Sequence, residues 1–185
     1  MGSLIPIKTC KLSLWGFSVL VLFICANLTA QDYFPLAVGN MWVYEVKQGD
    51  STFIDTCVIS GTSSFKEPYT YVYKTSKELF FLKKEGHTVL VYFLGQSYPC
   101  TLLVTPLEVG KCWRYGERFR VKVESKETVS VSIVTFTCYK LNFYFVEGDS
   151  EKLCTTLWVA PSVGIVKQFS IEGEGRILKD YKIKQ

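Results

Sequence analysis

Residues that could carry acid–base or nucleophilic chemistry are few in this chain of 185 residues. The single histidine, His87, follows Gly86 in an expected turn, and Gly-x-Ser-x-Gly is absent. A hydrolase of the Ser-His-Asp or Cys-His type needs an imidazole to move the proton. The sequence therefore argues against that class of enzyme.

Acidic side chains are a second possible source of catalysis, because two carboxylates a few ångströms apart suffice for glycoside hydrolysis. None of the candidates stands in a motif that distinguishes it from a solvated strand or turn residue. They are Glu45, Asp55, Glu108, Glu117, Glu124, Glu147 and Asp149. We therefore expect no catalysis, and a carboxylate-dependent envelope hydrolase is the last of the alternatives.

The first 30 residues are typical of a cleaved export signal. Lys8 and Lys11 give a positive start, residues 12–24 are an uncharged and mostly apolar run, and Ala30 offers a small residue for cleavage before Gln31. The apolar run of 13 residues is short for a bilayer span, which needs about 20. We expect a signal helix over 1–30, cleavage near Ala30, and a secreted or periplasmic protein that is not integral to the membrane.

Cys25 raises the question of a lipoprotein signal, in which a cysteine follows a small residue. Here the bulky Ile24 precedes it, which argues against lipid attachment.

The mature chain would carry a net charge of about +2, with charges spread singly and no basic run beyond Lys83-Lys84. A face that binds phosphates needs clustered basic residues. We therefore expect no nucleic-acid partner.

Cysteines are the remaining candidates for metal binding or cross-linking. Five follow the signal segment: Cys57, Cys100, Cys112, Cys138 and Cys154. No two have the spacing of a zinc knuckle, and one histidine cannot complete a site, so we expect no metal and no cofactor. Cys100 and Cys112 are the pair that we predict as a possible disulfide. The alternative is that most of the five are small buried hydrophobic residues.

A repeated segment indicates how the chain is built. Pro35-Leu-Ala-Val-Gly-Asn-Met-Trp-Val-Tyr44 returns 71 residues later as Pro106-Leu-Glu-Val-Gly-Lys-Cys-Trp-Arg-Tyr115. Each copy is typical of a turn that leads into a strand, since Pro fixes φ and Gly accepts a positive φ. We interpret the repeat as a structural framework, with these anchors: Pro35, Gly39, Trp42, Pro106, Gly110 and Trp113.

The hydrophobic pattern after Asn40 has a period of two rather than 3.6. Phe119, Val121 and Val123 alternate with charged residues, and Val129 to Ile133 alternates with Thr and Ser. The intervening Ser125-Lys126-Glu127 predicts a tight reversal between two strands. Further strands are expected over 42–46, 52–60, 69–75, 79–83, 87–94, 100–104, 135–146, 153–160, 164–172 and 176–183.

About 11 to 13 antiparallel strands are too many for a flat sheet. The predicted fold is all-β, with a strongly curved sheet that forms a barrel or half-barrel; a sandwich is the alternative. The expected organisation is a single β domain over 31–185, with two possible related halves at about 31–104 and 105–185.

Two strands suggest that the sheet is covered on both faces. Residues 89–94 and 141–146 are apolar or aromatic at nearly every position. The cover on one side could be the core, and on the other a ligand, a partner or a second layer of protein. Burial on both sides in a sandwich would explain the same pattern.

Two stretches resemble a known group of proteins. Asp32-Tyr-Phe-Pro-Leu-Ala-Val-Gly-Asn-Met-Trp-Val-Tyr44 directly after the signal, and Leu157-Trp158-Val-Ala-Pro161-Ser-Val-Gly164-Ile-Val-Lys167, are similar to two hallmarks of uncharacterised bacterial secreted and envelope proteins of the DUF3108/TapB-like kind. The resemblance covers about residues 32–170. It implies an envelope-associated β-rich fold, adds Trp158, Pro161 and Gly164 to the expected anchors, and brings no catalytic residues.

The resulting hypothesis is an exported β-rich binding protein whose partner is a hydrophobic or lipid-like ligand or an envelope protein. The alternative is a structural or assembly component of the cell envelope without a small-molecule site. The sequence identifies no binding residues.

Overall fold

The computed structural model describes residues 31–64, 70–132 and 134–184, which form strands, turns and irregular segments. Within these ranges no residue is helical, and no helix is long and apolar enough to cross a membrane. The predicted signal helix over 1–30, its cleavage near Ala30 and the question of lipid attachment at Cys25 lie outside the described residues.

The strands form one 12-stranded antiparallel sheet. In chain order they are β1 Met41–Gln48, β2 Ser51–Ser63, β3 Thr70–Lys74, β4 Leu79–Glu85, β5 Thr88–Phe93, β6 Cys100–Val104, β7 Cys112–Tyr115, β8 Phe119–Val131, β9 Val134–Glu147, β10 Ser150–Ala160, β11 Gly164–Ser170 and β12 Gly175–Lys182.

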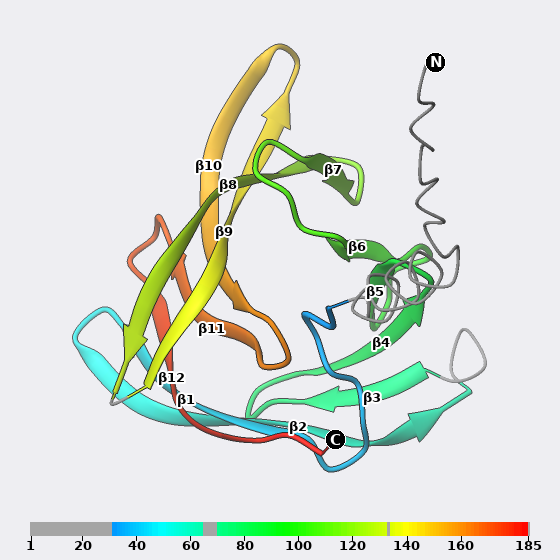
Figure 1. Cartoon of the computed structure of the whole chain (residues 1–185). Helices are drawn as coiled ribbons and strands as arrows, with labels where there is room; N and C mark the ends of the chain where they lie inside the picture. Colours follow the sequence, from blue (N-terminus) through cyan, green and yellow to red (C-terminus); the bar gives the residue numbers. More distant parts are fainter. Residues whose placement is uncertain (1–30, 65–69, 133, 185) are drawn as a thin grey trace, which may run out of the picture. The chain divides into compact units, whose positions relative to one another are not determined.

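Neighbours in the chain are neighbours in the sheet, except that β1 pairs with β12 and the edges are β6 and β7. The sheet curls so that these two edges approach each other (Figure 1). Trp113 Nε1 on β7 donates a hydrogen bond to the Thr101 carbonyl on β6 at 3.0 Å. The structure thus confirms the all-β prediction and forms a nearly closed barrel, because a sheet of this many twisted strands must curl.

One predicted reversal is wrong. Ser125-Lys126-Glu127 lies inside β8, which continues to Val131, and the chain reverses after Ser132, whose φ is +51°. The register shifts between Val123 and Ser125, which marks a bulge rather than a turn. Polar residues are stable there because they have cross-strand partners: Glu127 accepts a hydrogen bond from Trp158 Nε1, and Lys126 lies 5.4 Å from the centre of the Tyr139 ring.

The segment before β1 closes one end of the barrel. Tyr33 and Phe34 are buried, and the Asp32 carbonyl accepts a hydrogen bond from Ser162 N at 2.6 Å. The Phe34 ring lies 5.8 Å from that of Trp42. The turn after β10 and this segment thus pack together, and Tyr33, Phe34 and Val163 belong to the hydrophobic core.

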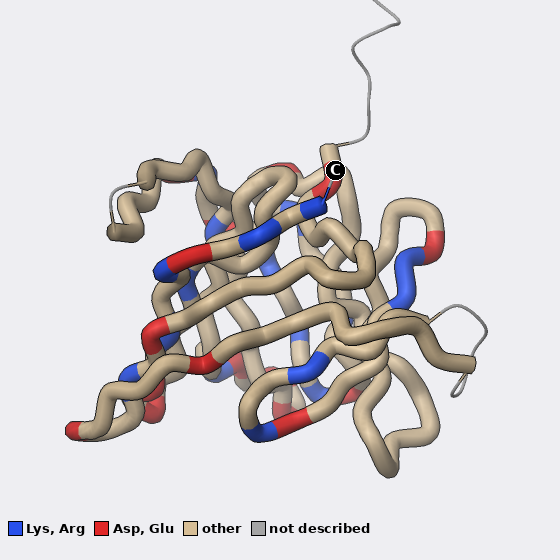
Figure 2. The backbone as a smooth tube through the Cα atoms, turned by 90° about the horizontal axis from the view of Figure 1, so that it is seen from below, with Lys and Arg blue, Asp and Glu red and all other residues tan. Residues whose placement is uncertain are grey.

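Charged residues of both signs are interspersed over the strands and turns (Figure 2). Several form pairs on the outer face, such as Lys179 with Glu45 at 3.1 Å and Lys122 with Glu124 at 3.0 Å. These exposed pairs contribute little stability, but they keep the outer face polar.

Candidate functional site

The interior of the barrel holds a cavity of about 530 Å³. That volume is within the range of small-molecule binding pockets, roughly 300–1,000 Å³. Phe34 lines it at the closed end, while the exposed side chains of Lys77, Glu78 and Glu174 line it at the other end. The cavity is therefore open to solvent at a rim that we define by these last three residues.

One side of the cavity is an aromatic wall, formed by Phe80, Phe93, Tyr115, Phe119 and Phe143. The rings contact one another edge to face: Phe80 and Phe93 centroids are 5.2 Å apart, and Tyr115 and Phe143 centroids are 5.5 Å apart. Such pairs are rigid and lose little entropy when they cover an apolar molecule.

The opposite side comes from β1, β2, β11 and β12 and carries polar groups. Val46 pairs with Phe53 on β2 and with Arg176 on β12, and Gln168 on β11 pairs with Arg176 in turn. Because residues paired across strands point to the same face, this row lines the cavity together. The interior is thus amphipathic.

Arg176 is the unusual member of that row. Its guanidinium carbon lies 4.9 Å from the centre of the Tyr44 ring, and its Nε atom is buried without a hydrogen-bond partner. None of the ion pairs among the described residues includes Arg176. An arginine remains charged in proteins and buried polar atoms are normally hydrogen-bonded, so the Nε donor of this half-buried side chain lacks the acceptor that it requires.

Asp55 is a buried acid that lines the same cavity as Arg176, but its carboxylate oxygens already accept other hydrogen bonds. Oδ1 accepts from Ser76 N at 2.9 Å, and Oδ2 accepts from Cys57 Sγ at 3.7 Å. Burial alone would raise the pKa of Asp55, but these hydrogen bonds and the Arg176 charge outweigh it and hold the pKa below its ordinary value. An ionised carboxylate of this kind is a poor general acid.

At the rim, two of the three charged side chains, Lys77 and Glu174, have a partner of their own. Gln48 bridges two of them: its Nε2 donates to Glu174 Oε1, and its Oε1 accepts from Lys77 Nζ at 3.2 Å. Lys77 also lies 4.8 Å from the centre of the Phe53 ring. Lys77 and Glu174 are therefore engaged at the rim itself, with Gln48 and Phe53.

The structure places the first set of predicted anchors at the closed end. Trp42 is 1% exposed and donates to the Val163 carbonyl at 2.6 Å, and Pro35 is buried. Gly39 has a φ of +92°. None of the three lines the cavity.

The second set is at the sheet edge. Trp113 is half-buried, Pro106 is exposed, and Gly110 has a φ of +91°. The cavity is contacted in this copy by the tyrosine, Tyr115, rather than by an anchor residue.

The C-terminal anchors are split between the two faces. Gly164 is buried with a φ of +100°, and a Cβ there would lie 3.7 Å from Phe34 and Trp42. Pro161 is half-buried in the turn after β10. Trp158 is half-buried, with Lys167 Nζ 4.8 Å from its ring centre.

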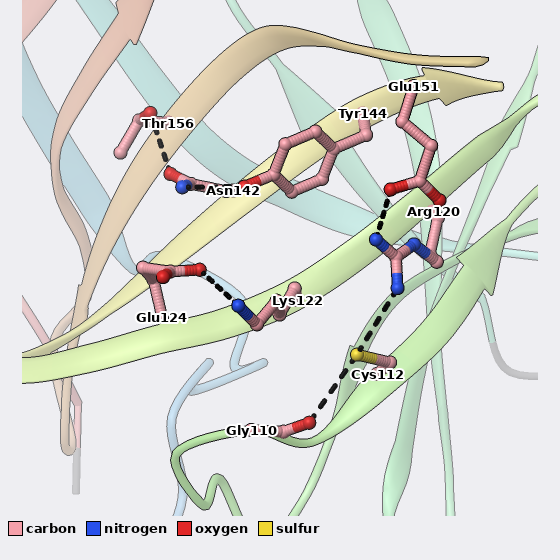
Figure 3. Close-up of polar contacts among 9 residues, drawn as sticks. All are labelled: Gly110, Cys112, Arg120, Lys122, Glu124, Asn142, Tyr144, Glu151 and Thr156. Carbon is pink, nitrogen blue, oxygen red and sulfur yellow. Dashed lines mark hydrogen bonds and ion pairs between the residues drawn. The ribbon is translucent and has the colours of Figure 1, made fainter.

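The predicted Cys100–Cys112 disulfide is absent, and all five described cysteines are free thiols. Cys100 packs against the core, two residues before the cavity-lining Leu102. Cys112 is exposed on the outer face, where its sulfur lies 3.9 Å from Arg120 Nη1 (Figure 3). The two side chains therefore point to opposite faces of the sheet. Successive residues of a strand alternate between the faces, and the spacing of two cysteines in the sequence does not reveal which face each one takes.

The remaining predicted chemical groups are spread out. His87 is exposed in the turn between β4 and β5 and is not among the cavity residues. Of the acids that the sequence offered, Asp55 alone lines the cavity; Glu45 and Glu124 pair with lysines outside. Within the described ranges, His, Cys, Asp and Glu side chains form no group of three suited to a metal ion.

Sequence reasoning missed Arg176. A signal was available, since Arg176 shares its alternation with Leu178, a core residue, and a charge at an inward position of a strand is unusual. The strand face could not be assigned from the sequence because the neighbouring Ile177 is also apolar.

Comparison with solved structures identifies the fold. A predicted exported protein with a YmcC-like fold from Bacteroides fragilis superimposes with a TM-score of 0.51 at 13% sequence identity, covering 83% of this chain and 99% of that one. A predicted lipoprotein from Parabacteroides distasonis has a TM-score of 0.44 at 12% identity, covering 83% of this chain and 99% of that one. At such identities the first likeness shows the fold alone.

No protein-family model and no curated protein matches the chain significantly. The YmcC-like fold rests on the structural comparison with the B. fragilis protein, and the resemblance of the chain to the DUF3108/TapB-like group stays a prediction.

Proposed function

We propose that this chain is an exported binding protein without catalytic activity, and that its barrel interior takes a hydrophobic or lipid-like ligand. The observation that carries the proposal is the cavity of about 530 Å³ with its aromatic wall. A barrel built only as a scaffold would fill its interior with side chains, as small barrels do.

Export and an envelope or secreted location are part of this proposal. They are supported by the signal-like residues 1–30 and by the description of the B. fragilis neighbour as a predicted exported protein. N-terminal sequencing of the mature protein tests the location, and Gln31 is the expected first residue. A mature chain that begins at Cys25 would contradict the cleavage site.

The binding proposal is tested by native mass spectrometry and lipid extraction of the protein purified from its own envelope. The expected result is an apolar molecule that co-purifies with the wild-type protein and is lost from Leu102→Trp, which fills the cavity from β6. Ile54→Trp is the matched control, because Ile54 is 58% exposed and does not line the cavity.

The alternative, a structural or assembly component, makes a different prediction. It expects no apolar ligand in the wild-type protein, and partner proteins that co-purify equally with both tryptophan variants. That result would contradict the binding proposal.

A further inference from the structure

The cavity is lined by a charged group, Arg176, whose buried Nε has no hydrogen-bond acceptor among the described residues. Arg176 lies in a row with Val46, Phe53 and Gln168. Its Nε is buried without an acceptor, and its guanidinium carbon lies 4.9 Å from the centre of the Tyr44 ring. Arg176 is half-buried as a whole, but leaving its buried Nε without an acceptor is costly, since the hydration of that atom is lost and no protein hydrogen bond replaces it. The geometry is that of a binding group aimed at a ligand.

We propose that the ligand is an anionic amphiphile, whose acidic head binds the Arg176 guanidinium and whose apolar body lies against the aromatic wall. This inference rests on the proposed function and narrows its ligand class. A planar guanidinium offers paired N–H donors that match the two oxygens of a carboxylate or phosphate. Gln168, directly opposite Arg176 on β11, supplies a further amide at the same point.

Asp55 does not satisfy Arg176, although both line the cavity. Its Oδ1 is held by Ser76 N at 2.9 Å, its Oδ2 is contacted by Cys57 Sγ at 3.7 Å, and no ion pair joins it to Arg176 within the part of the chain that the structure describes. The negative charge of Asp55 nevertheless lies at the same cavity and repels the acidic head of the ligand. Removal of this charge should therefore raise the affinity for an anionic ligand, and the direction of that change can be measured.

The aromatic wall excludes a small inorganic anion as the whole ligand. Phe80, Phe93, Tyr115, Phe119 and Phe143 present apolar surface that a free phosphate or sulfate would leave uncovered. A molecule with an apolar body and one acidic end matches both sides of the cavity.

The test compares ligands that share one alkyl chain and differ in the head. The delipidated full-length mature protein is titrated calorimetrically with dodecanoate, dodecyl phosphate, dodecanol and dodecyltrimethylammonium below their micellar concentrations. At least one anionic ligand should bind about tenfold to hundredfold more tightly than dodecanol, as a charge-assisted hydrogen bond implies, and the cation most weakly. Which of the two anions binds better distinguishes a carboxylate head from a phosphate head.

Variants locate the effect. Arg176→Met should abolish the preference for the anion while leaving dodecanol affinity within about twofold, and Arg176→Lys should keep part of it because the charge remains. Asp55→Asn should raise the affinity for the anion, whereas a purely structural role would lower the affinity for every ligand. Arg120→Met is the control, since Arg120 lies outside and pairs with Glu151.

The outcomes separate the two proposals. If the wild-type protein binds dodecanol and the anions equally, the acidic-head inference is overturned while ligand binding stands. If none of the four ligands binds, the proposed function fails together with it. The wild-type series decides even if Arg176→Met does not fold, and an unchanged preference in a folded Arg176→Met would also overturn the inference.

Discussion

The two copies of the repeated segment build the same turn at different places in the sheet. In the first copy Gly39 N donates to the Ile59 carbonyl at 2.8 Å, and in the second Gly110 N donates to the Val123 carbonyl at 2.8 Å. The residue after each glycine even makes the same side-chain bond to the proline carbonyl, Asn40 at 2.9 Å and Lys111 at 2.8 Å. Ten residues thus carry enough local information to repeat a backbone path.

Their surroundings differ because β1 is inside the sheet and β7 is an edge. β1 is flanked by β2 and β12, whereas β7 is paired with β8 alone. Trp42 is therefore 1% exposed, but Trp113 is half-buried and reaches across the barrel seam to Thr101. The same sequence pattern serves as a core anchor in one place and as a closing contact in the other.

The largest expected effect is on the tryptophans. Trp42→Ala should lower the free energy of unfolding by about 3–5 kcal/mol, since a large buried side chain is removed. Trp113→Ala should cost about 1–2 kcal/mol, because less of its surface is buried. Urea denaturation of both variants measures the difference, and equal losses would contradict the contrast between core and edge.

A smaller difference is expected at the residue that follows each glycine. Asn40 is fully buried, and its Oδ1 also accepts from Lys184 N at 2.8 Å, so Asn40→Ala should cost about 1–3 kcal/mol. Lys111→Ala should change stability by less than about 0.5 kcal/mol, as for ordinary surface positions. Thermal unfolding of the pair tests this, and a large loss in Lys111→Ala would show that its bond to Pro106 matters more than its exposure suggests.

Replacement of the two glycines should lower stability by similar amounts, because both copies share the same turn conformation. With φ of +92° and +91°, Gly39→Ala and Gly110→Ala should each lose about 1–2 kcal/mol through backbone strain. A Cβ at Gly39 would meet only the flexible end of Lys184, and one at Gly110 meets nothing within 4 Å. Losses that differ by more than about 1 kcal/mol in chemical denaturation would mean that packing, not φ, dominates.

The smallest expected effect is a pH dependence at the residue that pairs with the tyrosine of the first copy. Tyr44 pairs with Asp55 on β2, while the corresponding Tyr115 pairs with Phe119 on β8. The pKa of Asp55 is below its ordinary value in the folded protein: burial would raise it, but the hydrogen bonds from Ser76 and Cys57 and the Arg176 charge prevail.

Stability from such a group is fully present above the unfolded pKa of about 3.9 and is lost as the pH falls through the lower folded value. Asp55→Asn should therefore flatten the loss of stability below about pH 4. Equilibrium unfolding between about pH 2 and 6 measures it. An unchanged acid slope would show that other carboxylates carry the effect.

Much of the fold follows from local patterns. The alternation of apolar and polar residues predicted the antiparallel all-β class, and the strand number predicted curling, because both depend on near neighbours in the chain. The reversal at Ser125-Lys126-Glu127 failed for a nonlocal reason: Trp158 and Tyr139, from other parts of the chain, stabilise these polar residues in an extended strand. A polar triplet cannot reveal such partners.

Apart from the reversal after β8, the sequence by itself determined the turns, the strand periodicity and the shared geometry of the two repeat copies, since these are set by φ preferences and side-chain alternation within a few residues. Only the tertiary structure decided which copy is buried, which face Cys100 and Cys112 take, and that Arg176 points into an aromatic cavity. Those outcomes depend on the pairing of β1 with β12 and on the approach of β6 and β7, contacts between residues far apart in the chain. The candidate site is a product of that closure.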